Sequence, residues 1–449
     1  MAVVGAGYAG LTAALRLRQA GRQVAVIEAR DRVGGRTCTE RAPDGTLIDH
    51  GGQWVGPTQL RLRGLAAEMG VETFQVYDQG KNIEYRDGQR HLYSGPISDA
   101  DPASAADIIE TILDVDLMAL EVPLAAPWSA ARAAEWDGQT FETWLERNSP
   151  SPRVAEALTL FVEAVLCCEP RDVSALHVLF YIHSAGGVQK LIGVRGNAQD
   201  SRFRGGAQAT AGRIAAQLGD ALILGAPVRD IWQGDGVRVD YQGGPDGGGG
   251  SVAADRVVVA VPPTLAGRIN YTPALPGFRD QLTQRVPMAS TIKVHCIYEQ
   301  PFWRAEGLSG QVTSVDGIAQ FTFDNSPEDG SRGVLVAFIE GDHARHWGRQ
   351  IPAEREAAVK ACLADYFGAQ AANPEHYLER VWHDEPYTRG CYGGLMPPGA
   401  WVSYGEALRE PCGLIHWAGT ETALEWSGYI DGAVSSGERA AAEVLAALT

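Results

Sequence analysis

A glycine triplet near the start is the first group of residues whose spacing could do chemistry. Gly5-Ala-Gly7-Tyr-Ala-Gly10 follows a short apolar run and precedes an alanine- and leucine-rich segment, and a second β-branched run at 24–27 ends in Glu28. In a strand–turn–helix–strand setting the first glycine permits a tight turn, the second lets the backbone approach a pyrophosphate, and the third lets helix and strand pack closely. The helix N-terminus directs free N–H groups at phosphates, and Glu28 is placed to accept hydrogen bonds from the hydroxyl groups of a ribose. The pattern predicts dinucleotide binding, with NAD and FAD both open.

Two further glycine pairs follow this motif. Gly34-Gly35-Arg36 combines small residues with a guanidinium, which fits a backbone that passes close to an anion, although an exposed turn is the plain alternative. Gly51-Gly52-Gln53-Trp54 repeats the pattern beside an aromatic residue. Two such pairs so close to a dinucleotide motif indicate a long cofactor lying extended against the backbone, and therefore favour FAD over NAD.

Several residues later in the chain carry groups suited to chemistry. Lys293 lies in an alternating strand pattern over 291–298, and Cys391-Tyr392 follows a glycine. The strand 414–417 leads into Gly419-Thr420-Glu421, a second junction that could face a phosphate. Taken alone, a strand lysine is usually solvated, a single cysteine is usually a small buried hydrophobe, and glycine-flanked tyrosines are usually structural.

The elements that must position these residues follow from hydrophobic periodicity. Helical spacing recurs through the middle of the chain, where Leu158, Phe161, Val162, Val165 and Leu166 are the expected core of a helical part of a second domain. The glycine-rich stretch 243–251 predicts a loop between two strands. The expected helices are 103–122, 154–166, 174–183, 209–218 and 352–368, and the expected strands are 221–224, 236–242, 252–261, 291–298, 318–323, 334–340 and 414–417.

Composition restricts the class of protein. A chain of 449 residues exceeds one ordinary core, so two or three domains are expected. The net charge of −17 argues against nucleic acid or an anionic membrane as a partner. Seven cysteines without a Cys-x-x-Cys pair predict neither a disulfide framework nor a metal site. With no leader-like segment and no apolar run of about 18 residues, a cytoplasmic, soluble protein is expected.

Three islands of sequence resemble the flavin-containing amine oxidases, and among them the monoamine oxidases. They are 3–36, 290–304 and 384–445. Specific motifs are Ile292-Lys293 followed by Pro301-Phe302-Trp303-Arg304, and Gly390-Cys391-Tyr392; the most specific is Ala418-Gly-Thr-Glu-Thr with Trp426-Ser-Gly-Tyr429. The resemblance implies an α/β fold with a discontinuous Rossmann-like FAD-binding domain and an α+β substrate domain of β-sheet flanked by helices. The expected boundaries are 1–76, 204–279 and 385–449 for the first domain, and 77–203 and 280–384 for the second.

The resemblance also implies roles for particular residues. Tyr392 and Tyr429 match the tyrosines that flank the amine, Lys293 matches the lysine bridged by water to flavin N5, and Trp382 matches a tryptophan near that water. Cys391 matches the cysteine that monoamine oxidases join to the flavin 8α-methyl group, although related oxidases hold FAD without a covalent link. The implied cofactor-binding residues are Gly5, Gly7, Gly10, Glu28, Arg30, Gly35, Arg36, Gly52, Gln53, Trp54, Val228, Tyr387, Cys391, Gly419, Thr420 and Ile430, and the implied pocket residues are Phe161, Ile192, Gln199 and Phe321.

The implied reaction is oxidative deamination of a primary or secondary monoamine by FAD and O2, giving an aldehyde, ammonia and hydrogen peroxide. A diamine or polyamine oxidase would need a pocket carboxylate. Phe321 is apolar, but Glu163 is a candidate for that role. An amino-acid oxidase would need a pocket arginine, a flavin-binding scaffold would lack activity, and an NAD-dependent dehydrogenase would bind nicotinamide; these three classes stay open. The expected partners are a small amine and O2, and a homodimer stays open as well.

Overall fold

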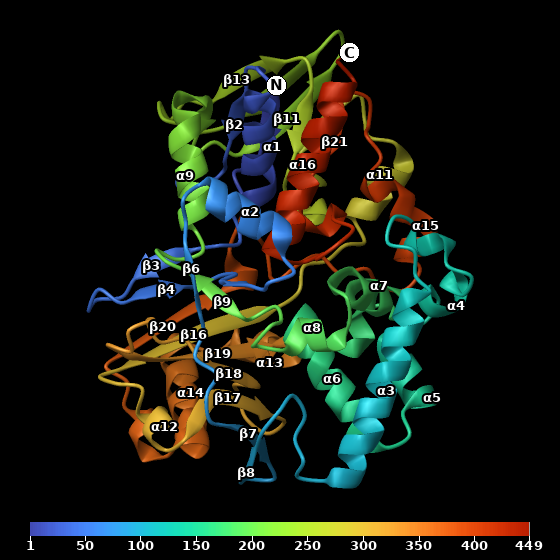
Figure 1. The fold of residues 1–449 in the computed structure, drawn as a ribbon. Helices are drawn as coiled ribbons and strands as arrows, with labels where there is room; N and C mark the ends of the chain where they lie inside the picture. Colours follow the sequence, from blue (N-terminus) through green and yellow to red (C-terminus); the bar gives the residue numbers. More distant parts are fainter. Residues whose placement is uncertain (449) are drawn as a thin grey trace.

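A five-stranded parallel sheet carries the glycine motif. The computed structural model describes residues 1–448, and the order of this sheet is β10 (Leu222–Ile223), β2 (Ala25–Ile27), β1 (Ala2–Val4), β14 (Val257–Val259) and β21 (Ile415–Trp417). Its central strands are buried runs of β-branched residues, as expected for a parallel sheet covered on both faces. The chain thus returns to this sheet from three distant segments, which confirms the predicted α/β class (Figure 1).

Two helices from opposite ends of the chain pack together against this sheet. Figure 1 shows α1 (Tyr8–Gln19) in blue beside α16 (Ile430–Ala446) in red, with both termini at the same end of the molecule. A Cβ on Gly437 would lie 2.3 Å from the main-chain oxygen of Ala9, so the small residue permits this close approach. Helices α2 (Leu60–Glu68) and α9 (Ala209–Leu218) complete the layer.

A four-stranded sheet lies next to the parallel one. Its order is β13 (Gly250–Ala254), β12 (Val237–Tyr241), β11 (Val228–Gln233) and β15 (Asn270–Thr272). The single strand predicted over 252–261 is wrong, because Asp255 and Arg256 break it into β13 and β14, which belong to different sheets. Periodicity could not detect the break, since 252–254 and 257–259 are both uninterrupted runs of valine and alanine, separated by only two polar residues. Short helices α10 (Pro263–Ala266) and α11 (Gly277–Thr283) follow.

A seven-stranded sheet is built from strands between residues 81 and 93 and between residues 291 and 381. Its order is β20 (His376–Val381), β16 (Thr291–Tyr298), β19 (Gly333–Glu340), β18 (Phe321–Asp324), β17 (Leu308–Ser314), β7 (Lys81–Arg86) and β8 (Gln89–Tyr93). Helix α14 (Pro352–Phe367) packs on one face together with α12 (Phe302–Ala305) and α13 (Gly341–Trp347). The other face carries Lys293, Phe321 and Phe338 toward the interior of the molecule.

The β7–β8 hairpin was not predicted, since the middle of the chain was interpreted as helical. Its turn is Asp87-Gly88, and both residues have positive φ, of 50° and 70°. Asp-Gly is a strong hairpin signal, but the flanking strands are rich in charged residues and lack a clear apolar alternation. The sheet tolerates them because the hairpin lies at its edge.

A block of helices covers the remaining side of the interior. It contains α3 (Pro102–Leu120), α4 (Ala133–Asp137), α5 (Phe141–Asn148), α6 (Pro152–Leu166), α7 (Ala175–Ala185), α8 (Val188–Ile192) and α15 (Ala400–Tyr404). The five residues predicted as core on α6 are all buried. On α3, by contrast, Ile109, Leu113, Leu117 and Leu120 are exposed.

The division into two domains stays a prediction, and one strand lies across its boundary. Strand β9 (Ser201–Phe203), at the end of the segment assigned to the substrate domain, pairs with β5 (Trp54–Val55) and β6 (Thr73–Gln75) of the other domain. A small hairpin of β3 (Thr39–Arg41) and β4 (Leu47–Asp49) lies nearby in sequence. Within residues 1–448, no helix is both long enough and apolar enough to cross a membrane.

Candidate active site

A cavity of about 950 Å³ runs between the parallel sheet, the seven-stranded sheet and helices α6 to α8. Its lining begins at the glycine motif and ends among aromatic residues of the second half of the molecule. Of the catalytic, cofactor-binding and pocket residues that the family resemblance implies, all line this cavity except Gly10 and Trp382. One continuous cavity thus brings together segments from the beginning, middle and end of the chain.

The turn after β1 adopts the geometry that its glycines permit. Gly5 has a φ of +98°, which favours glycine, and a Cβ on Gly10 would lie 2.0 Å from the main-chain oxygen of Gly5. Gly10 therefore lies behind the cavity as the packing residue between α1 and β1. Gly7 precedes α1 directly, and Gly7, Tyr8 and Ala9 line the cavity, so the N-terminus of this helix faces it.

Glu28 connects the end of β2 to this turn. Its Oε2 accepts a hydrogen bond from the main-chain N–H of Ala6 at 2.7 Å, and its Oε1 accepts from that of Arg30 at 2.9 Å. The carboxylate is buried and lines the cavity beside Arg30. Glu28 therefore lies at the end of the strand next to β1, beside the N-terminus of α1, which is the position that the glycine motif predicts for the acid that binds a ribose.

Arg36 links the second glycine segment to the end of the chain. Its Nη1 donates to the main-chain oxygen of Tyr392 at 2.8 Å and to Glu421 Oε1 at 2.6 Å. Burial would raise the pKa of Glu421, but Arg36 outweighs it and keeps that pKa below its usual range. Arg36 thus fixes the backbone on which Cys391 and Tyr392 are carried.

Cys391 lines the cavity as a free, buried thiol. Burial raises the pKa of Cys391 to about 12, while the nearby Arg36 and Arg30 act in the opposite direction. The side chain packs with Cys38 and Trp382. Trp382 itself lies one layer back from the cavity, where its Nε1 donates to the main-chain oxygen of His50 at 2.8 Å.

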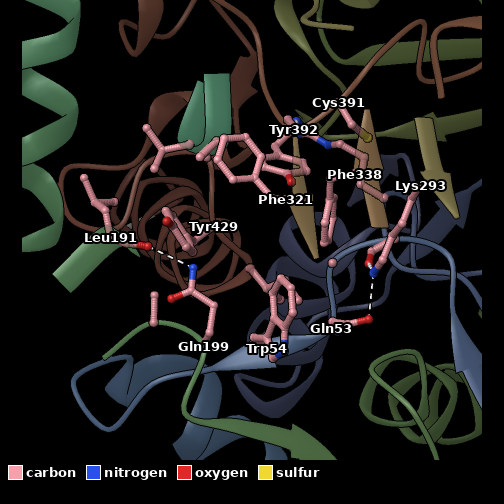
Figure 2. Close-up of a pocket in the computed structure, with 18 of the residues that line it drawn as sticks. Gln53, Trp54, Leu191, Gln199, Lys293, Phe321, Phe338, Cys391, Tyr392 and Tyr429 are labelled. Atoms are coloured by element: carbon pink, nitrogen blue, oxygen red, sulfur yellow. Dashed lines mark hydrogen bonds between the residues drawn. The ribbon is translucent and has the colours of Figure 1, made fainter. Parts of the chain in front are cut away.

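Lys293 is held in the cavity wall by two acceptors. Its Nζ donates to Gln53 Oε1 at 2.6 Å (Figure 2) and also to the main-chain oxygen of Gly51 at 2.8 Å. Gln53 Nε2 donates in turn to Asn325 Oδ1 at 2.8 Å. Burial lowers the pKa of Lys293 to about 7, so its ammonium can release and regain a proton near neutral pH.

Aromatic side chains form the walls of this cavity, and the ring centroids of Phe338 and Trp54 lie 5.4 Å and 5.6 Å from Lys293 Nζ. Tyr392 and Tyr429 both line the cavity, and burial raises the pKa of each hydroxyl, so both phenols are neutral. The ring of Phe338 meets Tyr392 edge-on at 6.5 Å between centroids, and Trp426 meets Tyr429 edge-on at 5.0 Å. Trp54 contributes a further ring against Phe338. The walls present ring faces and edges to anything that approaches Lys293.

The outer part of the cavity holds the predicted pocket residues. Phe161 comes from α6, Ile192 from the end of α8 and Phe321 from β18. Gln199 Nε2 donates to the main-chain oxygen of Leu191 at 2.9 Å, on the side of the cavity opposite Lys293 and Gln53 (Figure 2). Phe161, Ile192 and Phe321 make an apolar stretch of the passage, and the Gln199 amide borders it.

Six charged residues that line this outer part are paired with one another. Arg86 and Arg153 form ion pairs with both Glu84 and Glu156. Arg195 forms an ion pair with Asp78. Asp101 caps the N-terminus of α3, where its carboxylate accepts hydrogen bonds from main-chain N–H groups. Glu163, considered from the sequence as a pocket carboxylate, lies outside the described lining, where its Oε2 accepts from Gln320 Nε2 at 2.8 Å.

Several residues of the site had no assigned role in the sequence. Glu421 stands in the motif that begins at Ala418, and Asp49, which accepts from the main-chain N–H of Ala207 at 3.0 Å, precedes the second glycine pair, so both could have been found from their neighbours. Asn325 and Glu340 had no such signal. Each reaches the site from the end of a strand, and its contact is with a residue far away in sequence.

The lining as a whole fits a flavin dinucleotide. One end offers a helix N-terminus, a glycine turn and the Glu28 carboxylate. The other end offers a buried lysine, a thiol and aromatic walls. A dinucleotide is long enough to connect two such ends, and each end has groups of the type that its phosphates or its redox ring requires.

Comparison with known proteins agrees with this geometry. Residues 8–445 match the family model described as flavin containing amine oxidoreductase. The chain is 38% identical to amine oxidase [flavin-containing] B of Sus scrofa over 99% of this chain and 86% of that protein. The structure of wild-type putrescine oxidase bound to putrescine superposes with a TM-score of 0.95 at 37% identity, covering 99% of this chain and 98% of the other. Cyclohexylamine oxidase from Brevibacterium oxydans superposes with a TM-score of 0.94 at 33% identity, over 100% and 98% of the two chains. The chain therefore belongs to the flavin-containing amine oxidoreductase family.

Proposed function

We propose that this enzyme is an FAD-dependent oxidase of monoamines that produces an aldehyde, ammonia and hydrogen peroxide. The observation that carries the proposal is the cavity itself, in which a buried lysine and two tyrosines meet an apolar passage whose charged residues are already paired. When bound, the flavin supplies a two-electron acceptor for the α-carbon of the amine and a donor to O2. The chain supplies position, desolvation and proton handling.

The apolar passage supports a substrate with one amino group and an apolar body. An amine that enters this passage leaves water, which favours its neutral form, and only the neutral form has a free electron pair. Phe161, Ile192 and Phe321 offer contact for an alkyl or aryl group. The rings of Tyr392 and Tyr429 border the cavity, where the N–H bonds of the neutral amine can point at a ring face and so orient the nitrogen.

The paired charges argue against substrates that carry a second charge. A diamine would bring a distant ammonium that needs an unpaired carboxylate, yet Glu84, Glu156 and Asp78 are engaged by arginines. The fourth carboxylate, Asp101, is engaged by main-chain N–H groups at the start of α3. An amino acid would bring a carboxylate that needs an unpaired guanidinium, but those same arginines are engaged by the carboxylates. We therefore infer that both classes react more slowly than a monoamine.

A diamine remains the second candidate, because the solved structure of putrescine oxidase with putrescine is so similar to this chain. For a diamine to be the better substrate, one of the paired carboxylates would have to exchange its arginine for the substrate ammonium. Removal of Glu84 or Glu156 would then abolish diamine activity while monoamine activity persisted.

The proposed cofactor attachment is a thioether from Cys391 Sγ to the flavin 8α-methyl group. Its support is that Cys391 is a free thiol that lines the cavity, on the backbone segment that Arg36 holds. The adenosine end would be held by the glycine turn, Glu28 and Arg30. Residues Val228, Gly419 and Thr420 line the cavity between the two ends and would contact the middle of the cofactor.

A cytoplasmic location is the proposal that fits the cysteines. All seven are free thiols, as expected in a reducing compartment. A homodimer stays a prediction.

A peroxide-coupled screen tests the proposed function. Purified holoenzyme would be supplied in turn with benzylamine, phenethylamine, butylamine, putrescine, leucine and phenylalanine. We expect peroxide from the aryl-alkyl or alkyl monoamines at the highest kcat/KM. Faster turnover of leucine or phenylalanine would replace the proposal with an amino-acid oxidase, and faster turnover of putrescine with a diamine oxidase. A flavin that no substrate reduces would indicate a binding scaffold without catalysis.

A further inference from the structure

We propose that Glu340 is a positioning residue, which holds Tyr392 in place in the aromatic wall of the active site. The inference deepens the proposed function and rests on it, since Tyr392 matters only if it faces the reacting amine. Glu340 is the last residue of β19, whereas Tyr392 follows Cys391 in a later segment. Neither the reaction nor the family motif assigns Glu340 a part.

The direct contact is a hydrogen bond between the two side chains. The Tyr392 hydroxyl donates to Glu340 Oε1 at 3.0 Å, and the Glu340 side chain is completely buried. The other carboxyl oxygen, Oε2, has no hydrogen-bond partner within residues 1–448. Burying a carboxyl group is costly, and leaving one of its oxygens unpaired adds to that cost. Such a group is unexpected at a strand end where an apolar side chain would pack equally well.

Strand β19 holds Tyr392 at two points. Phe338 and Glu340 lie two residues apart and therefore share one face of the strand. Phe338 meets the Tyr392 ring edge-on, at an angle of 86°, while Glu340 accepts from the hydroxyl. The ring contact fixes where the ring lies, and the hydrogen bond fixes how far it can tilt. Together they set the ring face that Tyr392 presents to the cavity.

Glu340 is itself anchored from two neighbouring elements. Its main-chain N–H donates to Gln320 Oε1 at 2.8 Å, and Gln320 Nε2 donates to Glu163 Oε2 at 2.8 Å. Gln320 directly precedes β18, and Glu163 lies on α6, so both the sheet and the helical block restrain the acceptor. A restrained acceptor is what a positioning role requires.

The charge state of Glu340 is compatible with this role. Burial raises the pKa of Glu340 to about 8, and the groups that surround the carboxyl are Thr291, Cys167 and Tyr392, with Glu163 as a nearby acid. Burial and the neighbouring Glu169 raise the pKa of Glu163 to about 8 as well. A neutral carboxyl still accepts a hydrogen bond through its carbonyl oxygen, so the Tyr392 contact persists on either side of neutral pH.

A double-mutant cycle tests the inference. The rate of flavin reduction by a saturating monoamine would be measured anaerobically for wild type, E340L, Y392F and the double variant Y392F/E340L. We expect E340L to lower this rate about tenfold, with a smaller change in apparent Kd, because one hydrogen bond to a buried hydroxyl is lost. In the Y392F background the same Glu340 substitution should lower the rate less than twofold, since the hydroxyl it acts through is absent.

Two further variants separate positioning from general structural damage. E340Q keeps an acceptor oxygen and should recover most of the lost rate, to within about threefold of wild type. D137L removes a buried carboxyl outside this network, on α4, where Asp137 Oδ2 accepts a hydrogen bond from the main-chain N–H of Val402 at 2.8 Å, and its effect should be additive with Y392F. Flavin content and thermal unfolding would be recorded for each variant. E340M, which keeps the length of the side chain without an acceptor, replaces E340L if that variant loses its flavin.

The outcomes are distinct. Coupling between Glu340 and Tyr392, with rescue by E340Q, supports the inference. Equal losses from E340L in the wild-type and Y392F backgrounds overturn it and leave the proposed function standing, because the wild-type flavin is then still reduced. A wild-type flavin that no monoamine reduces overturns the proposed function and this inference with it.

Discussion

Lys293 Nζ donates to Gln53 Oε1 at 2.6 Å, and this contact joins strand β16 of the seven-stranded sheet to the segment Gly51-Gly52-Gln53. The two residues are 240 positions apart. Asn325 fixes Gln53 from the other side, so the amino group has little freedom to leave the cavity wall. A lysine held in this way, with its pKa lowered by burial, is suited to hold or release a proton beside a redox ring.

Replacement of this lysine should impair turnover without loss of the fold. In K293M we expect kcat to fall about 100-fold or more, the range typical of a lost proton-handling group. Steady-state peroxide production measures this effect. K360M, on the solvent side of α14 where Lys360 pairs with Glu356, is the matched control and should retain wild-type turnover. Equal activity of K293M and wild type would contradict the assigned role.

The lowered pKa of Lys293 also has a consequence for stability. Burial lowers this pKa from 10.5 to about 7. Between those values the unfolded chain binds a proton at Lys293 that the folded chain does not, so the free energy of unfolding of wild type rises with pH relative to K293M. The gain is at most about 1.4 kcal/mol per pH unit within this window. Urea unfolding of both proteins at pH 6.5 and pH 9 measures it, and a constant difference between them would show that the pKa is not lowered.

Cofactor retention should depend on Gly10, although it does not line the cavity. The Cβ of G10A would lie 2.0 Å from the main-chain oxygen of Gly5, so the turn must open and the phosphate site with it. We expect the ratio of flavin to protein to fall by more than half, measured as absorbance at 450 nm against 280 nm. G64A is the matched control, because nothing lies within 4 Å of its Cβ and alanine favours helix α2 by roughly 0.5–1 kcal/mol. Full flavin content in G10A would disprove the packing argument.

The thioether at Cys391 can be tested by acid precipitation. Wild-type protein should carry its yellow colour into the pellet, whereas C391A should release it to the supernatant. C412A changes a half-exposed cysteine that does not line the described cavity and should behave as wild type. Yellow colour in the wild-type supernatant would mean that the flavin is held without a covalent bond.

Ile192 should set the width of the apolar passage. I192F narrows it, so we expect KM to rise about tenfold for phenethylamine and less than threefold for butylamine, in line with 1–3 kcal/mol per misfitted apolar group. I192A widens the passage and should reverse that preference. Equal shifts of both KM values in I192F would show that Ile192 does not border the substrate path.

The sequence predicted the bounds of helices and strands better than it predicted which strands pair with one another. Strand β16 and helix α9 were predicted with the bounds that the structure has, because each is a continuous run with a clear period. The β7–β8 hairpin and the break between β13 and β14 were missed. Their strands follow sheet pairing rather than local hydrophobicity, and pairing partners cannot be read from a single segment.

The site shows the same division. Motifs identified Lys293, Cys391, Tyr392 and Tyr429, and the cavity brings all four together. Glu340 could not be found this way, because its only contact with the motif runs through space from the end of another strand. The contact of the Glu163 side chain with Gln320 could not be predicted either, because helical spacing places Glu163 on α6 but does not identify the residue that its carboxylate contacts.

Anaerobic reduction of the flavin tests the central claim most directly. Purified enzyme would be mixed without oxygen with benzylamine, phenethylamine or butylamine, and the flavin absorbance near 450 nm would be followed in time. We predict that at least one of these monoamines bleaches the band, that the limiting rate exceeds those for putrescine and leucine, and that air restores the colour with release of peroxide. A band that persists with every amine, or that bleaches fastest with putrescine or leucine, would contradict the assignment as a monoamine oxidase.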